Sequence, residues 1–311
     1  MKTLRRSVAL ALSVAAALGA VSTPASAAGP ITSYGTVTHI GDGDTIDVDV
    51  EGDGTGTPIR VRLAGINTME LTRYANDPAN WRGECHAVEA AKAVRALVLN
   101  KRVKLTAQDA SSMSGSRYRR VVWRQVDGGW RDVSHELLDW GHGLFLSNGV
   151  EYDRNRAHAA AAQYAAYKGR GLWDRDYCGV GPNQAADLRV QVNWNADGND
   201  ATNVNGEWIK VENRSTYDVP LAGWRVRDSA ARGYLQRGFV FPEAAKVKAG
   251  SAVYVHVGKG SNTATRFYWG LGAPIFENAT EDPTYKGDGG YLFDPQGDAR
   301  AWHMYPCRYR C

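Results

Sequence analysis

The chain has 311 residues, of which 43% are hydrophobic, and a formal net charge of +4 at pH 7. Three of its positive charges lie within the first six residues, and leaving them out reduces the net charge to +1. A chain this close to neutral lacks the strong basic excess typical of nucleic-acid-binding proteins, so any such function must depend on a local basic patch. The length exceeds what one hydrophobic core usually needs and predicts two domains.

The N-terminal segment has the features of a secretory signal. Its basic start precedes an apolar run over residues 8–20 and a small-residue cleavage motif, Ala25-Ser26-Ala27. We therefore expect a signal peptide over residues 1–27, cleavage near Ala27/Ala28 and a secreted, extracellular protein. The apolar run is too short to cross a membrane and no second run of about 20 apolar residues follows, so we expect no transmembrane segment.

Residues 31 to about 177 combine strand and helix patterns. Apolar and charged residues alternate over 46–50 and 61–63, which is typical of strands with one buried face. Apolar residues from Ala87 to Val98 recur at the helical period and predict an amphipathic helix. The remaining elements are a strand in "RVKLTAQ", a hairpin "RRVVWRQVDGGWRDV" turning at Asp127-Gly128, a short helix "SHELLDWG" capped by its serine, and an Ala-rich helix over about 154–168.

The helical period ends after a predicted linker, "CGVGPNQAAD", which leads from residue 178 into a second domain over 187–311. Its segments "GEWIKVEN", "GWRVRD" and "AVYVHVG" are short alternating strands separated by turn residues. Regular short strands of this kind predict a β-sandwich. We therefore expect a mainly β protein.

The turn "GDGDT" and the strand that follows it carry the residues for a distinct chemistry. Asp42 and Asp44 supply carboxylate oxygens, which a hard divalent cation prefers. Arg62, on the next strand, could meet charge that develops on phosphoryl oxygens. Glu70 could accept a proton from an attacking water. Together they suggest metal-assisted phosphodiester hydrolysis; a polar turn beside a surface strand is the alternative.

Several segments in order resemble the staphylococcal-nuclease-like (thermonuclease) family. They are "DGDT" at 42–45, "VRLAGINTMEL" at 61–71, a later hairpin, "DVSHELLDWGHGLF" and "YKGRGLW", and they cover about residues 33–173. The resemblance implies a five-stranded OB-like barrel with packed helices, and calcium-dependent cleavage of DNA and RNA.

The resemblance also implies a calcium site. Asp44 would be a direct ligand with Asp42 nearby, and Asn67 and Thr68 would complete the site, Thr68 through its backbone carbonyl. The family usually has an aspartate where this chain has Asn67, so we expect weaker calcium binding. Met69 stands where the family usually has proline, which should reduce the rigidity of the loop.

Within the same resemblance, Arg62 would contact the scissile phosphate, and Glu70 would act as general base or orient the water. The family carries a second catalytic arginine in a Tyr-Gly-Arg hairpin, but here the stretch reads "GSRYRRVVWRQ". Arg117 and Arg119 are equal candidates, since they share one face of the strand.

Two neighbours extend this hairpin cluster. Tyr118 and Arg124 would bind the substrate, and together with the hairpin arginines they form the local basic and aromatic patch that a near-neutral chain requires. A solvated hairpin is the alternative interpretation.

The second domain resembles the lamin tail domain, an immunoglobulin-like sandwich, through "NGEWIKVEN" and "PLAGWRVRD". This resemblance implies a targeting or binding role, with a cell-envelope or polymer ligand. The segment "NADGND" at 195–200 lacks a complete calcium-loop pattern, so a turn built on asparagine or aspartate side chains is favoured there.

The four cysteines, in a chain expected to be exported, predict disulfides with three connectivities. Cys85–Cys178 would close the first domain, and Cys178–Cys307 would join the two domains; both pairings remain open. No C-x-x-C pair occurs, which disfavours a structural zinc site.

We therefore expect a secreted calcium-dependent nuclease, a hydrolase acting on DNA and/or RNA, with a C-terminal lamin-tail-like domain. The alternative is a noncatalytic nucleic-acid- or cell-surface-binding protein on a decayed nuclease barrel. The retained acids and Arg62 favour the enzyme, whereas Asn67 and the altered hairpin favour the alternative.

Overall fold

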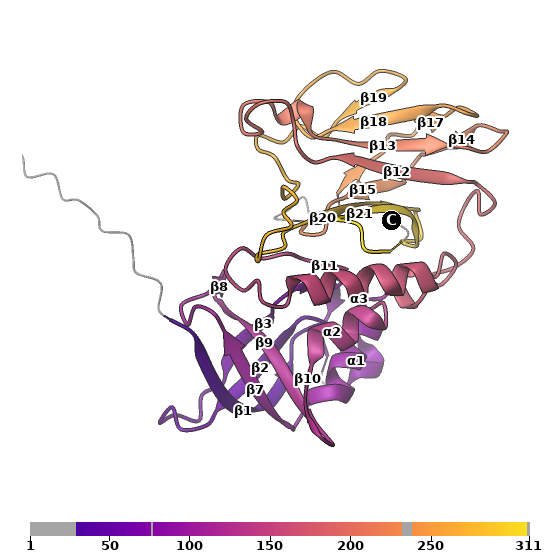
Figure 1. Ribbon diagram of the computed structural model, residues 1–311. Helices are drawn as coiled ribbons and strands as arrows, with labels where there is room; N and C mark the ends of the chain where they lie inside the picture. The colour runs from indigo at the N-terminus through magenta and orange to yellow at the C-terminus, as the bar shows by residue number, and fades with distance from the viewer. Residues whose placement is uncertain (1–28, 76, 232–237, 310–311) are drawn as a thin grey trace, which may run out of the picture.

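The computed structural model describes residues 29–75, 77–231 and 238–309, so the expected signal peptide lies outside the described residues. The chain is mainly β, as expected, and forms two β units, with helices packed on the first of them (Figure 1). In this described part, no helix is long and apolar enough to cross a membrane.

The first unit is a closed five-stranded barrel. Its strands pair in the order β3-β2-β1-β7-β9, and a parallel pairing of β9 with β3 closes the ring. Their bounds are β1 Ile31–Ile40, β2 Thr45–Val50, β3 Ile59–Leu63, β7 Arg102–Ala107 and β9 Arg117–Val126. The alternation of the sequence accounts for the barrel core, because Ile46, Val48 and Val61 are fully buried while Asp47 faces outward and pairs with Arg60.

Short strands extend this framework. Two of them matter for the pocket: β4 (Ile66–Asn67) pairs with β11 (Leu144–Phe145) beside the barrel. The others are β5 Leu71–Arg73, β6 Arg82–Gly83, β8 Met113–Ser114 and β10 Gly129–Asp132. The last of these forms the predicted hairpin with β9.

Three α-helices pack on the barrel: α1 (Ala87–Val98), α2 (Val133–Asp139) and α3 (Asn155–Lys168). The buried face of α1 is the apolar face that the sequence predicted. The predicted serine cap of α2 is wrong: Asp132 caps the helix by accepting from the backbone N–H of His135, and Ser134 lies buried inside the first turn. Aspartate and serine are equally good caps, so the local pattern could not choose between them.

The second unit is a sandwich of two four-stranded sheets. One has the order β12-β13-β18-β19 and the other β16-β15-β20-β21, and a small β14–β17 pair lies beside them. The bounds are β12 Leu188–Asn193, β13 Trp208–Asn213, β14 Val219–Pro220, β15 Arg225–Arg227, β16 Phe239–Val240, β17 Lys246–Val247, β18 Ala252–His256, β19 Arg266–Tyr268, β20 Asp288–Phe293 and β21 Ala299–Tyr305. Inward-facing residues of both sheets form one apolar core together with Trp224, which precedes β15.

The segment at 195–200 forms turns held by side chains. Asn199 Oδ1 accepts from the backbone N–H of Ala201, and Asp200 Oδ1 accepts from that of Ala196. The segment therefore forms the turn built on asparagine and aspartate side chains that the sequence predicted.

The two units share a continuous apolar core. In Figure 1, α3 lies between the barrel and strands β20 and β21. Trp173, in the 3₁₀ turn η2 (Gly171–Trp173), packs with its ring centroid 5.9 Å from that of Tyr291 and 4.9 Å from that of Trp302. Tyr285 and Phe293 of the second unit belong to the same buried cluster as the barrel residues. The units are therefore joined by a buried interface as well as by the linker.

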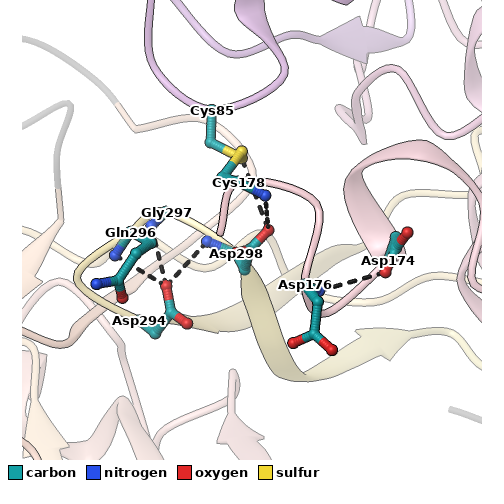
Figure 2. Close-up of a disulfide and its surroundings, with 8 residues drawn as sticks. All are labelled: Cys85, Asp174, Asp176, Cys178, Asp294, Gln296, Gly297 and Asp298. Atoms are coloured by element: carbon teal, nitrogen blue, oxygen red, sulfur yellow. Dashed lines mark hydrogen bonds between the residues drawn. A yellow bond between two sulfur atoms is a disulfide. The ribbon is translucent and has the colours of Figure 1, made fainter. Parts of the chain in front are cut away.

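A disulfide joins Cys85 to Cys178, with the two Cα atoms 5.9 Å apart. The structure thus selects the first of the two pairings that the sequence left open. Figure 2 shows that the backbone N–H of Cys178 also donates to Asp298 of the β20–β21 turn, at 2.9 Å. Arg300 donates to the carbonyls of Pro182 and Asn183, so the predicted linker is bound along the second unit.

Candidate active-site pocket

The turn between β1 and β2 is built on glycine and aspartate. Asp42 Oδ1 accepts from the backbone N–H of Asp44 at 3.0 Å, which closes the turn. A Cβ at Gly43 would lie 2.7 Å from Ala90 Cβ and 2.7 Å from Thr68 Oγ1, so only glycine lets the turn approach α1 and the Thr68 loop this closely. The packing therefore places Asp44 beside the "INTMEL" segment.

Asp44 is the centre of a buried polar network, with only 3% of its surface exposed. Its Oδ2 lies 2.6 Å from Arg62 NH1 and accepts from the backbone N–H of Thr68 at 2.9 Å. Its Oδ1 accepts from the hydroxyl of Thr45 at 3.1 Å. Charge-assisted bonds of this kind hold a side chain rigidly.

Arg62 alternates with Val61 and Leu63, whose side chains enter the barrel core, and points into the pocket. Its NH2 donates to Asn67 Oδ1 at 2.8 Å. The Asn67 side-chain nitrogen in turn donates to the carbonyls of Ser229 at 2.8 Å and Ala230 at 3.3 Å, both in the second unit. Asn67, expected in a metal shell, here connects Arg62 to the other domain.

The acids around Asp44 have perturbed protonation equilibria. Burial, followed by the charge of Asp44, raises the pKa of Asp42 to about 7. Burial and then Asp44 also raise the pKa of Glu70. Burial raises the pKa of Tyr74, and the charges of Asp42 and Glu70 add to the effect. Crowded carboxylates in a pocket are a frequent mark of functional sites.

A divalent cation is only partly accommodated by this arrangement. Carboxylate oxygens whose mutual repulsion raises their pKa values are what a cation would stabilise. However, both oxygens of Asp44 already accept hydrogen bonds. Among the described residues, one group of His, Cys, Asp or Glu side chains has its possible ligand atoms within 4.8 Å of one another. It consists of Cys85, His86, Cys178 and Asp298, and the acids around Asp44 do not form such a group.

Both candidate hairpin arginines, Arg117 and Arg119, line the pocket. Arg117 NH1 donates to the hydroxyl of Thr45 at 3.0 Å, next to Asp44, and its charge opposes the rise in the pKa of Glu70. Arg119 stands opposite Arg62 in the β3–β9 pairing, and its NH1 donates to Ser112 Oγ at 3.3 Å. Arg117 therefore contacts the network of acids through the Thr45 hydroxyl.

Tyr118 and Arg124 do not line this pocket. Tyr118 projects from the opposite face of β9, where the Arg120 guanidinium carbon lies 5.1 Å from its ring centre. Arg124 forms a two-bond ion pair with Glu136, at 2.6 and 2.7 Å. The structure thus brings the two hairpin arginines to the site but not the predicted substrate-binding pair.

The pocket encloses about 450 Å³, and residues of both units line it. From the first unit come three arginines, Glu70, Asn67 and the loop after β11; from the second come Ala230 and Ala231, which follow β15. No motif in the sequence marked these two alanines. They reach the site only because the two units dock.

Comparison with known proteins identifies the second unit. Residues 183–307 match the family model described as Lamin Tail Domain, an immunoglobulin-like β domain, in agreement with the sandwich. No nuclease family model matches the chain. No curated protein matches it.

Proposed function

We propose that this chain is a secreted, metal-dependent nuclease, a phosphodiesterase that hydrolyses DNA and/or RNA. The observation that carries the proposal is the buried Asp44–Arg62 pair in a pocket that also holds Glu70 and two further arginines. Cations gathered beside crowded carboxylates suit a substrate that is an anion and whose transition state gains charge.

The surroundings of each side chain suggest its role. Arg62, held in place by Asp44 and Asn67, would bind the scissile phosphate. Arg117, which donates to Thr45 beside Asp44, would stabilise the charge that develops on the phosphate. Glu70 has a raised pKa, so it is a stronger base than an ordinary carboxylate and is suited to take a proton from water.

Calcium is the proposed cofactor, with Asp44, Asp42 and the Thr68 carbonyl as its ligands. When bound, it would polarise the phosphodiester. A cation at these acids would also favour the ionised form of Asp42, whose pKa is otherwise raised to about 7.

For the lamin-tail unit we propose a binding or targeting role toward a cell-envelope component or another anionic polymer. A second pocket, of about 310 Å³, has three cationic side chains in its lining, Arg175, Arg189 and Lys210. Glu212 lines it too and pairs with Lys210 at 3.4 Å, so Arg175 and Arg189 are the cations that favour an anionic ligand.

One assay tests the enzymatic proposal. The purified protein is incubated with plasmid and with single-stranded DNA, in a calcium titration reaching tens of millimolar and in chelator. Cleavage that requires calcium supports the proposal. Intact substrates under all conditions would favour the alternative, a noncatalytic binding protein. The hydrogen bonds that already occupy both Asp44 oxygens are consistent with that alternative.

A further inference from the structure

A single amide side chain links the two units at the pocket. Asn67 accepts from Arg62 through Oδ1 and donates through its nitrogen to the carbonyls of Ser229 and Ala230. The side chain is 7% exposed, so these bonds form away from bulk water. Both polar ends of the amide are used, one by each unit.

The segment that receives this amide, residues 228–231, is itself firmly held. The backbone N–H of Ser229 donates to Asp288 at 3.0 Å, and that of Ala231 donates to Asp228 at 2.9 Å. Arg227 NH2 donates to the Ser229 carbonyl at 3.3 Å. The segment is therefore anchored to the sandwich, and its position determines where the Asn67 side chain is held.

The same segment forms a wall of the pocket. Ala230 and Ala231 line it together with Arg62, Arg117 and Arg119. Their small side chains leave the space in front of the arginines open. A larger side chain at position 230 would project toward that space.

We propose that the lamin-tail unit completes the nuclease pocket and that Asn67 is the positioning residue that couples the 228–231 segment to Arg62. The proposal rests on the proposed function only for the nature of the ligand. It explains the asparagine chemically: an ionised aspartate only accepts hydrogen bonds, so at position 67 it would set a carboxylate against the carbonyls of Ser229 and Ala230.

Hydrogen exchange of the backbone amides tests the coupling without any substrate. The variant is Asn67→Asp, and the matched control is Gln163→Glu. Gln163 likewise donates its amide to a carbonyl of the second unit, that of Pro306 at 2.8 Å, but it does not line the pocket. Thermal unfolding establishes that both variants are folded.

In Asn67→Asp we expect the amides of Ser229 and Ala231 to exchange about tenfold faster, the effect of losing buried hydrogen bonds at this segment. In Gln163→Glu their exchange should stay as in the wild type, because the donor lost there bonds Pro306 and not the 228–231 segment. If 228–231 exchanges at the wild-type rate in Asn67→Asp, the coupling is refuted.

A second variant tests the wall from the lamin-tail side. Binding of a fluorescent single-stranded DNA octamer is measured by anisotropy in chelator, for wild type, Ala230→Trp and the control Ala249→Trp, an exposed position. We expect Ala230→Trp to weaken binding by about tenfold, equivalent to about 1.4 kcal/mol, and the control to bind as wild type.

Equal binding by Ala230→Trp and wild type would overturn the proposed wall. If the wild type itself neither binds nor cleaves DNA, the nuclease proposal fails, while the exchange experiment still decides the coupling. The two failures are therefore distinguishable.

Discussion

Two buried acidic sites in the first unit differ sharply in how their charges are balanced. At the junction of α2 and α3, Asp132 accepts from Arg154 at 2.8 Å and lies 2.7 Å from His158 Nε2. Burial alone would raise the pKa of Asp132, but His158 and Arg154 hold it well below its usual range. Around Asp44, burial and neighbouring acids instead raise the pKa values of Asp42 and Glu70.

The difference indicates a structural role for Asp132 and a functional role for the acids around Asp44. Asp132 is an acid with matched partners, and it also caps α2. Asp42 and Glu70, by contrast, have more neighbouring negative charge than bound cations to balance it. Such an arrangement lowers the stability of the fold, and it is found where a ligand or a reaction uses the charges. Five substitutions can break or sharpen this contrast.

The largest effect is expected from Glu70→Gln. Loss of a general base should lower kcat about 100- to 10,000-fold. The melting temperature should not fall, since Glu70 is not part of a matched ion pair and folding raises its pKa. Initial rates of plasmid cleavage in calcium measure this, with the barrel-surface variant Glu51→Gln as control; equal rates for Glu70→Gln and wild type would remove Glu70 from the mechanism.

Asp132→Asn should have the opposite effect, with a loss of about 3 kcal/mol of stability at pH 7, because Arg154 loses its counter-charge and the buried His158 loses a carboxylate partner. The pKa of Asp132 is lowered by folding, so its stabilisation is present above the unfolded pKa near 4 and fades as the pH falls below it.

Urea unfolding at pH 7 and at pH 3 measures this, and the difference between variant and wild type should shrink at pH 3. Asp47→Asn, which removes an outward-facing ion pair with Arg60, is the control and should cost less than about 1 kcal/mol. An Asp132→Asn variant as stable as the wild type at pH 7 would mean that the cluster is not structural.

The two hairpin arginines can be separated by lysine substitutions, which keep the charge but lose the planar fork of donors. We expect Arg117→Lys to reduce kcat about 100-fold, the effect of losing one well-placed donor. Arg119→Lys, at an arginine that lines the pocket and donates to Ser112, should mainly raise KM by a few fold. Steady-state cleavage kinetics decide, and the reverse ranking would assign catalysis to Arg119.

The smallest effect is expected from Asp42→Asn. Folding raises the pKa of Asp42 to about 7, so this group favours the folded state less as the pH rises from about 4 to 7. The variant should match the wild type at pH 4 and be more stable by about 1–2 kcal/mol at pH 8. Thermal melts at the two pH values measure this.

Adding calcium should reverse that order at pH 8. A ligand that binds only the folded state stabilises it, and the wild type would gain more than a variant without the carboxylate. Calcium that stabilises both proteins equally would show that Asp42 is not part of the metal site.

Several elements of the pocket could be predicted because their signals are local. The "GDGD" turn, the alternation that turns Arg62 away from the core, and the two-residue spacing of Arg117 and Arg119 all follow from short-range backbone geometry. Arg124 shows the limit of that reasoning. Its charge suited a substrate patch, but Glu136, twelve residues away, engages it instead.

The sequence by itself determined the two β units, the apolar face of α1 and the acids of the first turn, because periodicity and turn chemistry are properties of neighbouring residues. Only the tertiary structure decided that Cys85 pairs with Cys178, that Asn67 faces Ser229, and that Ala230 lines the pocket. These contacts join residues 93 or more positions apart. They depend on how the two units pack against each other, which no local pattern encodes.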